Sequence, residues 1–183
     1  ITNAYALWVD AGKVRFDGAL TVGGTSVTGI TIATEQASTS GTFIDFTAIP
    51  AGTKRITIMM SGVSTNGTSD MIIQIGDAGG IESAGYAGSN TIAGLTVQYP
   101  GAGFTLNNNG ATAAGVYNCV FTLVLENSAA FRWMGSGLVA STTDSTALTC
   151  GNKALSAELD RVRLTTAGGA NTFDAGVVSI SYE

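Results

Sequence analysis

The residue types that commonly carry out chemistry are scarce in this sequence. It contains no histidine, which removes the commonest general base and the commonest zinc ligand in proteins. A nucleophilic Ser or Cys needs a neighbouring His, or a Lys of lowered pKa, and neither a GxSxG nor an SxxK motif occurs. We therefore expect no enzymatic activity, no catalytic residue, no cofactor and no metal site.

The acidic residues do not suggest a catalytic pair either. There are 13 of them, and hydrolysis of a glycan would require two to converge on one bond. They are scattered along the chain, so we interpret them as solvated surface groups. Calcium loops of the DxDxDG type are absent. Two oxygen-rich segments, Asn66–Asp70 and Asn107–Asn109, could hold an ion, but hairpin turns explain them equally well.

Cys119 and Cys150 are the only cysteines, which is too few for a disulfide scaffold. Cys119 lies in the apolar run Val116–Leu125, and this position predicts a small buried thiol. A bridge to Cys150 is an open alternative, because sequence spacing cannot decide it.

The segment Asp160–Arg163 (DRVR) places two arginines on one face of an expected strand. We expect these arginines to pair with strand-borne acids such as Asp174 or Glu183. The functional alternative is that they capture a phosphate or sulfate group of a glycan.

The overall composition excludes several classes of protein. The 183 residues are 45% hydrophobic and only 11% charged, with 25 glycines, two prolines and a net charge of −5. The normal apolar content disfavours disorder, and the scarcity of charged helix formers disfavours a helical bundle. The acidic balance disfavours nucleic-acid binding, and no apolar run reaches the roughly 18 residues that span a bilayer. A start at Ile1 rather than Met leads us to expect a fragment or processed product of a longer protein.

Hydrophobic periodicity indicates strands and turns almost throughout. Alternation with period two predicts seven principal strands: Thr42–Ile49, Lys54–Met60, Met71–Asp77, Val116–Asn127, Phe131–Ser141, Leu159–Thr166 and Val177–Glu183. We expect Gly135–Gly137 to form a turn or bulge, and Ala154–Arg161 to be a loop entering a strand. Trp133 lies at strand period, which favours a core position over a role in binding. The predicted fold for residues 31–183 is an all-β, antiparallel, jelly-roll-like sandwich.

The first 30 residues differ from the rest and are expected to form a short extended β stem. Apolar residues alternate there with polar or small ones: Leu7, Trp8, Val9, Phe16, Leu20 and Val22. Strands this short are marginal alone, so these side chains need a cover. One alternative is the same segment of neighbouring chains around a symmetry axis, which predicts a homotrimer. The other is the sandwich of the same chain.

A binding surface is the remaining kind of functional site. The longest non-periodic stretch is Asp77–Gly115, and loops this long are usually functional or disordered. Within it, aromatic and amide side chains suit sugar recognition, which gives five candidate receptor-binding residues: Tyr86, Tyr99, Asn107, Asn108 and Asn109. The alternative is that the stretch holds irregular strands, such as Leu95–Tyr99 and Phe104–Leu106, that complete the sandwich.

Three segments resemble the C-terminal regions of bacteriophage and prophage tail fibres and related virion proteins: Ala6–Gly29 (ALWVDAGKVRFDGALTVGGTSVTG), Phe43–Asp70 (FIDFTAIPAGTKRITIMMSGVSTNGTSD) and Leu159–Glu183 (LDRVRLTTAGGANTFDAGVVSISYE). The resemblance implies a homotrimer with a short intertwined stem, followed by β-sandwich heads that adhere to a bacterial surface glycan or outer-membrane receptor. It also implies a place in the virion after assembly in the host cytoplasm, without membrane insertion. Two alternatives are a decoration or neck/collar protein that binds capsid or tail, and a glycan depolymerase.

Overall fold

The computed structural model describes residues 21–22, 25–26, 29–92, 101–107, 111–113, 115–143 and 146–183. All regular structure in these residues is β-strand, as the composition predicts, and each strand pairing is antiparallel. No helix that could cross a membrane occurs among them.

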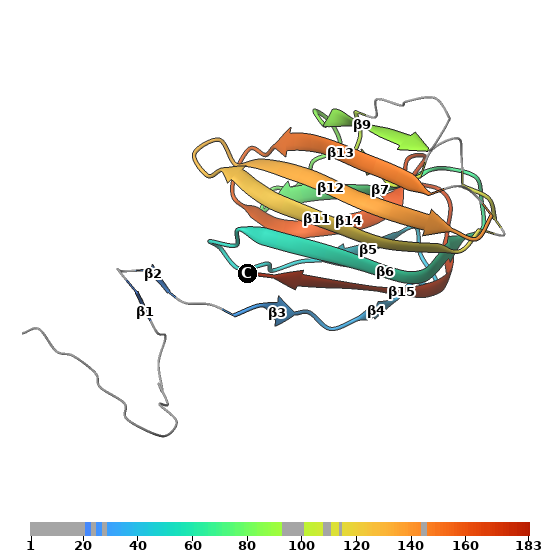
Figure 1. The fold of residues 1–183 in the computed structure, drawn as a ribbon, viewed down its shortest axis with the longest axis horizontal. Helices are drawn as coiled ribbons and strands as arrows, with labels where there is room; N and C mark the ends of the chain where they lie inside the picture. The colour runs from blue at the N-terminus through green and yellow to red at the C-terminus, as the bar shows by residue number, and fades with distance from the viewer. Residues whose placement is uncertain are drawn as a thin grey trace, which may run out of the picture.

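Two sheets form a sandwich, and Figure 1 looks onto the larger one with the smaller one behind it. The eight-stranded sheet contains, in spatial order, β3 (Thr31–Ile32), β15 (Phe173–Tyr182), β6 (Arg55–Thr65), β11 (Tyr117–Asn127), β12 (Arg132–Ser141), β13 (Ala147–Ala154) and β9 (Ala87–Ile92), and β4 (Gln36–Ala37) also pairs with β15. The five-stranded sheet contains β10 (Phe104–Thr105), β7 (Met71–Asp77), β14 (Leu159–Thr166) and β5 (Phe43–Phe46), and β8 (Gly80–Ile81) pairs with β7. The predicted all-β antiparallel sandwich is confirmed, and a jelly-roll-like arrangement is consistent with it.

The core lies between the two sheets, and most strands contribute alternate residues to it. In β11, Phe121 and Leu123 are fully buried, whereas Val120 and Val124, which precede and follow this pair, are exposed. The strand β7 is buried at every position, because it is central in its sheet and its second face is also covered. There Gln74 Nε2 donates a hydrogen bond to the Ala102 carbonyl at 2.9 Å.

Before β3, the structure describes β1 (Thr21–Val22) and β2 (Thr25–Ser26), which pair with each other antiparallel. Of the expected stem residues, only Val22 falls on a described strand. The other five lie outside the described residues: Leu7, Trp8, Val9, Phe16 and Leu20.

The predicted strands are confirmed, and two further long strands are added. β6 continues to Thr65, five residues beyond the expected end, and β13 and β9 were not expected. The expected loop before β14 is confirmed for residues 155–158. The expected turn at Gly135–Gly137 is wrong, because these residues lie inside the continuous strand β12.

The glycines of β12 are needed by the core rather than by a turn. A Cβ on Gly135 would lie 2.7 Å from Phe121 Cζ, and one on Gly137 would lie 2.6 Å from Phe121 Cδ2 and 2.8 Å from the Val120 carbonyl oxygen. Phe121 is 0% exposed and pairs directly with Gly137 in the sheet. Its ring therefore occupies the space that side chains at these two positions would fill.

We expect Gly137→Ala to destabilise the fold by about 1–3 kcal/mol, the usual cost of overpacking a core. The midpoint of urea unfolding measures this change. Gly101→Ala is the matched control, because a Cβ there has nothing within 4 Å. Equal midpoints for the two variants would contradict the assignment of Phe121 to this space.

Candidate functional site: the distal loops

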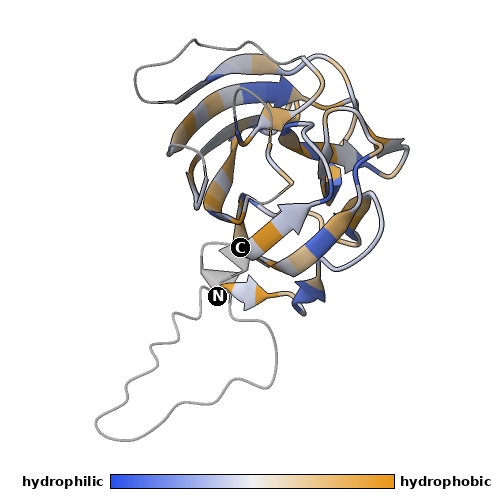
Figure 2. Cartoon of the chain, turned by 90° about the vertical axis from the view of Figure 1, so that its right-hand side faces the viewer, coloured by the Kyte–Doolittle hydropathy of each residue, from blue (hydrophilic) through white to orange (hydrophobic). Residues whose placement is uncertain are grey.

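The sandwich has two ends with different surroundings. Thr31, near the start of the sandwich, pairs with Tyr182, and the backbone of Glu183 hydrogen-bonds to that of Arg55. The first and last strands of the sandwich therefore meet at one of its ends, which we call the proximal end. The strands run from there to the opposite, distal end, which is on the right in Figure 1 and faces the viewer in Figure 2. We call four loop segments of this end, residues 66–70, 111–113, 142–143 and 167–172, the distal platform.

Two loops of the platform, β6–β7 and β14–β15, are tied to each other by four hydrogen bonds. The Asn66 amide N–H donates to the Thr172 carbonyl and the Thr172 N–H donates to Asn66 Oδ1, both at 3.0 Å. Ser69 N–H donates to Asn171 Oδ1 at 3.0 Å. The fourth bond runs from Ala167 N–H to the Asp70 carbonyl at 2.8 Å. These bonds hold the two loops together.

Asn107, which follows β10, connects a third loop to the β6–β7 loop. Its Oδ1 accepts from Met71 N–H at 2.7 Å and its Nδ2 donates to Asp70 Oδ1 at 2.9 Å. Asn107 is only 3% exposed. Its role in the structure is therefore to position the platform, and the expectation that its side chain is presented to a receptor is corrected.

The last two loops of the platform are joined through hydroxyl groups. The Thr112 and Thr143 hydroxyls lie 2.8 Å apart, and Thr112 N–H donates to the Tyr117 hydroxyl at 3.2 Å. Thr142 N–H donates to the Val116 carbonyl at 3.1 Å. The platform is thus a set of polar loops held on a rigid scaffold, which is how proteins commonly present binding residues.

The exposed residues of the platform are small and uncharged: Asn66, Thr68, Ala113, Thr142, Thr143 and residues 167–170. Hydroxyls and amides can donate and accept hydrogen bonds, so such a surface suits a polar, uncharged ligand. In the described part of the chain, no three His, Cys, Asp or Glu side chains gather as a metal site would require.

Tyr86 lies at the proximal end and in the core, so the expectation of an exposed loop tyrosine is wrong. It is 6% exposed, and its ring packs edge-on against Phe104 with 5.1 Å between centroids. Its hydroxyl accepts from Ile75 N–H at 2.8 Å and donates to the Glu82 carbonyl at 2.9 Å. The glycines on either side of Tyr86 suggested an exposed loop, but the ring turns inward to fill the core.

A buried lysine stabilises the region around Tyr86 at the proximal end. Lys153 is 6% exposed, forms an ion pair with Glu82 and lies 5.7 Å from the centroid of the Tyr86 ring. The Ser156 N–H donates to the other oxygen of Glu82 at 2.7 Å, and the Ser156 hydroxyl donates to Asp77 at 2.6 Å. Each charge in the cluster has a partner, so the cluster stabilises this part of the fold.

The two arginines pair with strand-borne acids, as expected, but these are Asp45 of β5 and Asp160 of β14 rather than Asp174 or Glu183. Arg163 makes a two-bonded pair with Asp45 at 2.7 and 2.6 Å, with its guanidinium 4.1 Å from the centroid of the Phe43 ring. Arg161 pairs with its neighbour Asp160 at 2.6 Å. Both guanidinium groups are therefore engaged by carboxylates, which leaves the capture of a glycan phosphate without structural support.

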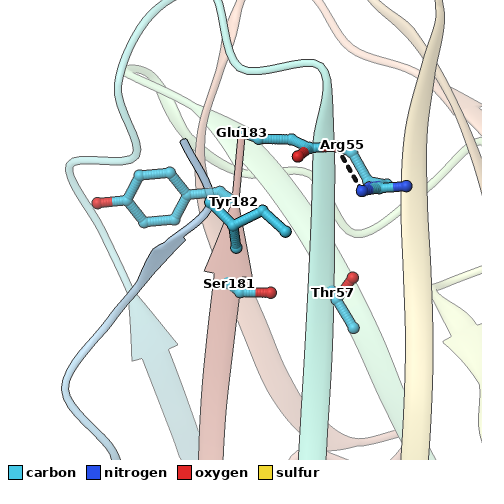
Figure 3. Close-up of a pocket in the computed structure, with 6 residues that line it drawn as sticks. Arg55, Thr57, Ser181, Tyr182 and Glu183 are labelled. Atoms are coloured by element: carbon cyan, nitrogen blue, oxygen red, sulfur yellow. Dashed lines mark ion pairs between the residues drawn. The ribbon is translucent and has the colours of Figure 1, made fainter. Parts of the chain in front are cut away.

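Glu183 instead pairs with Arg55 at 2.5 Å, beside a small pocket at the proximal end (Figure 3). Thr57, Ser181 and Tyr182 also line this pocket, and the Tyr182 ring points away from the ion pair. Its volume of about 40 Å³ is close to that of one water molecule. The pocket is therefore too small for a ligand.

Other expectations have mixed outcomes. Trp133 is 2% exposed and belongs to the core, as expected. Cys119 is buried, as expected, and Cys150 is exposed; the two are not bridged. Burial raises the pKa of Cys119 to about 12. Tyr99, Asn108 and Asn109 lie outside the described residues.

In comparisons with known proteins, no family model, curated protein or solved structure matches this chain.

Removing the Tyr86 hydroxyl with Tyr86→Phe should destabilise the fold by about 1–3 kcal/mol, because it leaves the buried Ile75 N–H without its acceptor. Urea unfolding measures the loss. Tyr182→Phe is the control, since Tyr182 is only partly buried. If Tyr86→Phe were as stable as the control, the Tyr86 hydroxyl would not contribute to the stability of the fold.

The proximal cluster should also make the fold sensitive to acid. Hydrogen bonds from Ser156 and Gly79 lower the pKa of Asp77. Burial raises the pKa of Glu82, but hydrogen bonds from Lys153 and Ser156 have a larger opposite effect, so the pKa of Glu82 is also lowered. Carboxyl groups with lowered pKa in the folded state stabilise it above their unfolded pKa of about 4, and this contribution is lost as pH falls through the folded pKa.

We therefore expect urea midpoints to fall between pH 7 and pH 3, and to fall less in Ser156→Ala, which is already weaker at pH 7. Ser128→Ala, at an exposed position away from the cluster, should behave as the unmodified chain. An unchanged pH dependence in Ser156→Ala would show that other groups cause the acid sensitivity.

Proposed function

We propose that this chain is the non-enzymatic tip domain of a phage tail fibre and that its distal platform binds the surface of the bacterial host. One observation carries the proposal: four loops are tied together at the end of the sandwich opposite to the point where the N-terminal segment enters. The N-terminal segment is the part of the chain expected to join the rest of the fibre. The distal platform therefore faces outward, where a receptor would be met.

The chemistry of the platform supports a bacterial surface glycan as the ligand. Its exposed groups are hydroxyls, amides and short apolar side chains, which match the hydroxyl and C–H groups of a sugar. Because the loops are already fixed by hydrogen bonds, little conformational entropy is lost on binding. The resemblance of the sequence to fibre C-terminal regions supports the same role, a homotrimeric state and a place in the virion.

A decoration or neck/collar protein of the virion is the second candidate. It is favoured by the uncharged apolar outer side of the eight-stranded sheet, which suits protein packing more than sugar binding. Such a protein would bind capsid or tail through that side and would not need the distal platform.

The test is binding of the fluorescently labelled chain to whole cells of a panel of bacterial strains. On a strain that binds it, we expect Thr68→Arg and Ala113→Arg to reduce binding by about tenfold or more, because each places a long cation on the exposed platform. Ser128→Arg adds the same charge at an exposed position of the proximal end and should leave binding unchanged.

Each variant is first checked for an unchanged urea midpoint and assembly mass. Equal binding by the platform variants and the proximal control would show that the platform is not the receptor site. Binding of the chain to virion particles, with none to any strain of the panel, would favour the decoration role.

A further inference from the structure

The outer face of the eight-stranded sheet, which faces the viewer in Figure 1, carries apolar side chains in cross-strand register. Met59, Val120, Leu138 and Leu148 are direct partners on four neighbouring strands. Directly paired residues point to the same side of a sheet, so these side chains form one row. Val120, Leu138 and Leu148 are 58%, 51% and 58% exposed.

The next row contains small hydroxyl and thiol side chains, apart from an isoleucine at the β3 edge. Its members are successive partners from β3 to β9: Ile32, Ser181, Thr57, Thr122, Ser136, Cys150 and Ser89. None of the residues in these two rows is charged. Between Ser89, Ser136, Leu148 and Cys150 the surface forms an open depression of about 450 Å³.

A third row lies nearer the proximal end and begins to carry charge. Val124 and Met134 are paired and are 46% and 39% exposed. Two ion pairs flank them, Arg55 with Glu183 and Arg132 with Glu126. Charged groups are thus confined to the margin of this face, although the chain has a net charge of −5.

We infer that this outer face packs against the outer faces of other copies of this chain, as in a trimer whose three sheets face a common axis. The rows alternate aliphatic and hydroxyl groups, and each hydroxyl can both donate and accept, so the face is complementary to itself. Two copies could meet without burying a charge. The described residues of the face are not aromatic, so it lacks the flat rings on which sugars stack.

The size of the face agrees with such an interface. Five strands about 4.8 Å apart, with about eight residues each at about 3.3 Å, cover roughly 600 Å². A stable interface buries about 800 Å² on each partner, and β15 and β3 extend the face toward that value. Ile30 and Ile32 on this extension are 62% and 70% exposed. They continue the apolar surface toward the N-terminal segment, where the sequence also predicts contacts between chains.

Cys150 provides a direct probe, because it is exposed in the single chain and lies on this face between Ser136 of β12 and Ser89 of the edge strand β9. In the intact chain at micromolar concentration, we expect a mass at least twice 18.5 kDa. Labelling of Cys150 by a maleimide should be about tenfold slower than in the dissociated chain, since a thiol inside an interface reacts only after dissociation. A Cys119→Ala background removes the second thiol.

Leu138→Lys combined with Leu148→Lys should abolish this protection by placing unpaired charges in the interface. Phe43→Lys is the control, because Phe43 is 50% exposed but lies on the other sheet, and it should leave mass and protection unchanged. If the double variant fails to fold, dilution of the intact chain serves instead and should restore rapid labelling.

Two outcomes would overturn the inference: a monomer, or an oligomer in which Cys150 reacts as fast as in the dissociated chain. The second would mean that contacts elsewhere hold the copies together. Both are independent of the proposed receptor binding, which is measured by attachment to cells through the distal platform.

Discussion

The register of the eight-stranded sheet is the constraint on which the rest of the structure depends. Side chains alternate with a period of two, so a slip of one residue would exchange the core face and the outer face of a strand. The ring of Phe121 opposes such a slip, because only Gly135 and Gly137 of β12 leave room for it. The same register separates the two thiols, with Cys119 inside and Cys150 outside, and it sets the outward rows of aliphatic and hydroxyl groups.

The sequence predicts those strands in which apolar residues occupy most of the inward positions. β13 fails this test because its pattern is inverted: Thr149 and Lys153 point inward, while Leu148 is exposed. Thr149 hydrogen-bonds to the Thr105 carbonyl and Lys153 pairs with Glu82, so distant residues compensate for their burial. In β9, Asn90 is likewise fully buried and donates to the Thr105 carbonyl. No local pattern contains this information.

The same reasoning applies to the candidate site. That loops gather at the two ends of a sandwich follows from the fold class, so a binding end opposite the N-terminal segment could be predicted. The individual residues could not. Tyr86 and Asn107 both stand in loop-like sequence, yet each is buried because its polar atoms meet the backbone of another segment. The partners of Arg163 and Glu183 similarly depend on which strands become neighbours.

The position of β15 has a consequence for how the protein is made. This strand lies between β6 on one side and β3 and β4 on the other, so residues near the two ends of the head are neighbours in one sheet. During synthesis, β6 has no partner on that side until the ribosome has released β15, more than a hundred residues later. Pairings between such distant segments form slowly and leave strand edges uncovered meanwhile. The nascent sandwich therefore cannot close one strand at a time and must wait for its last strand.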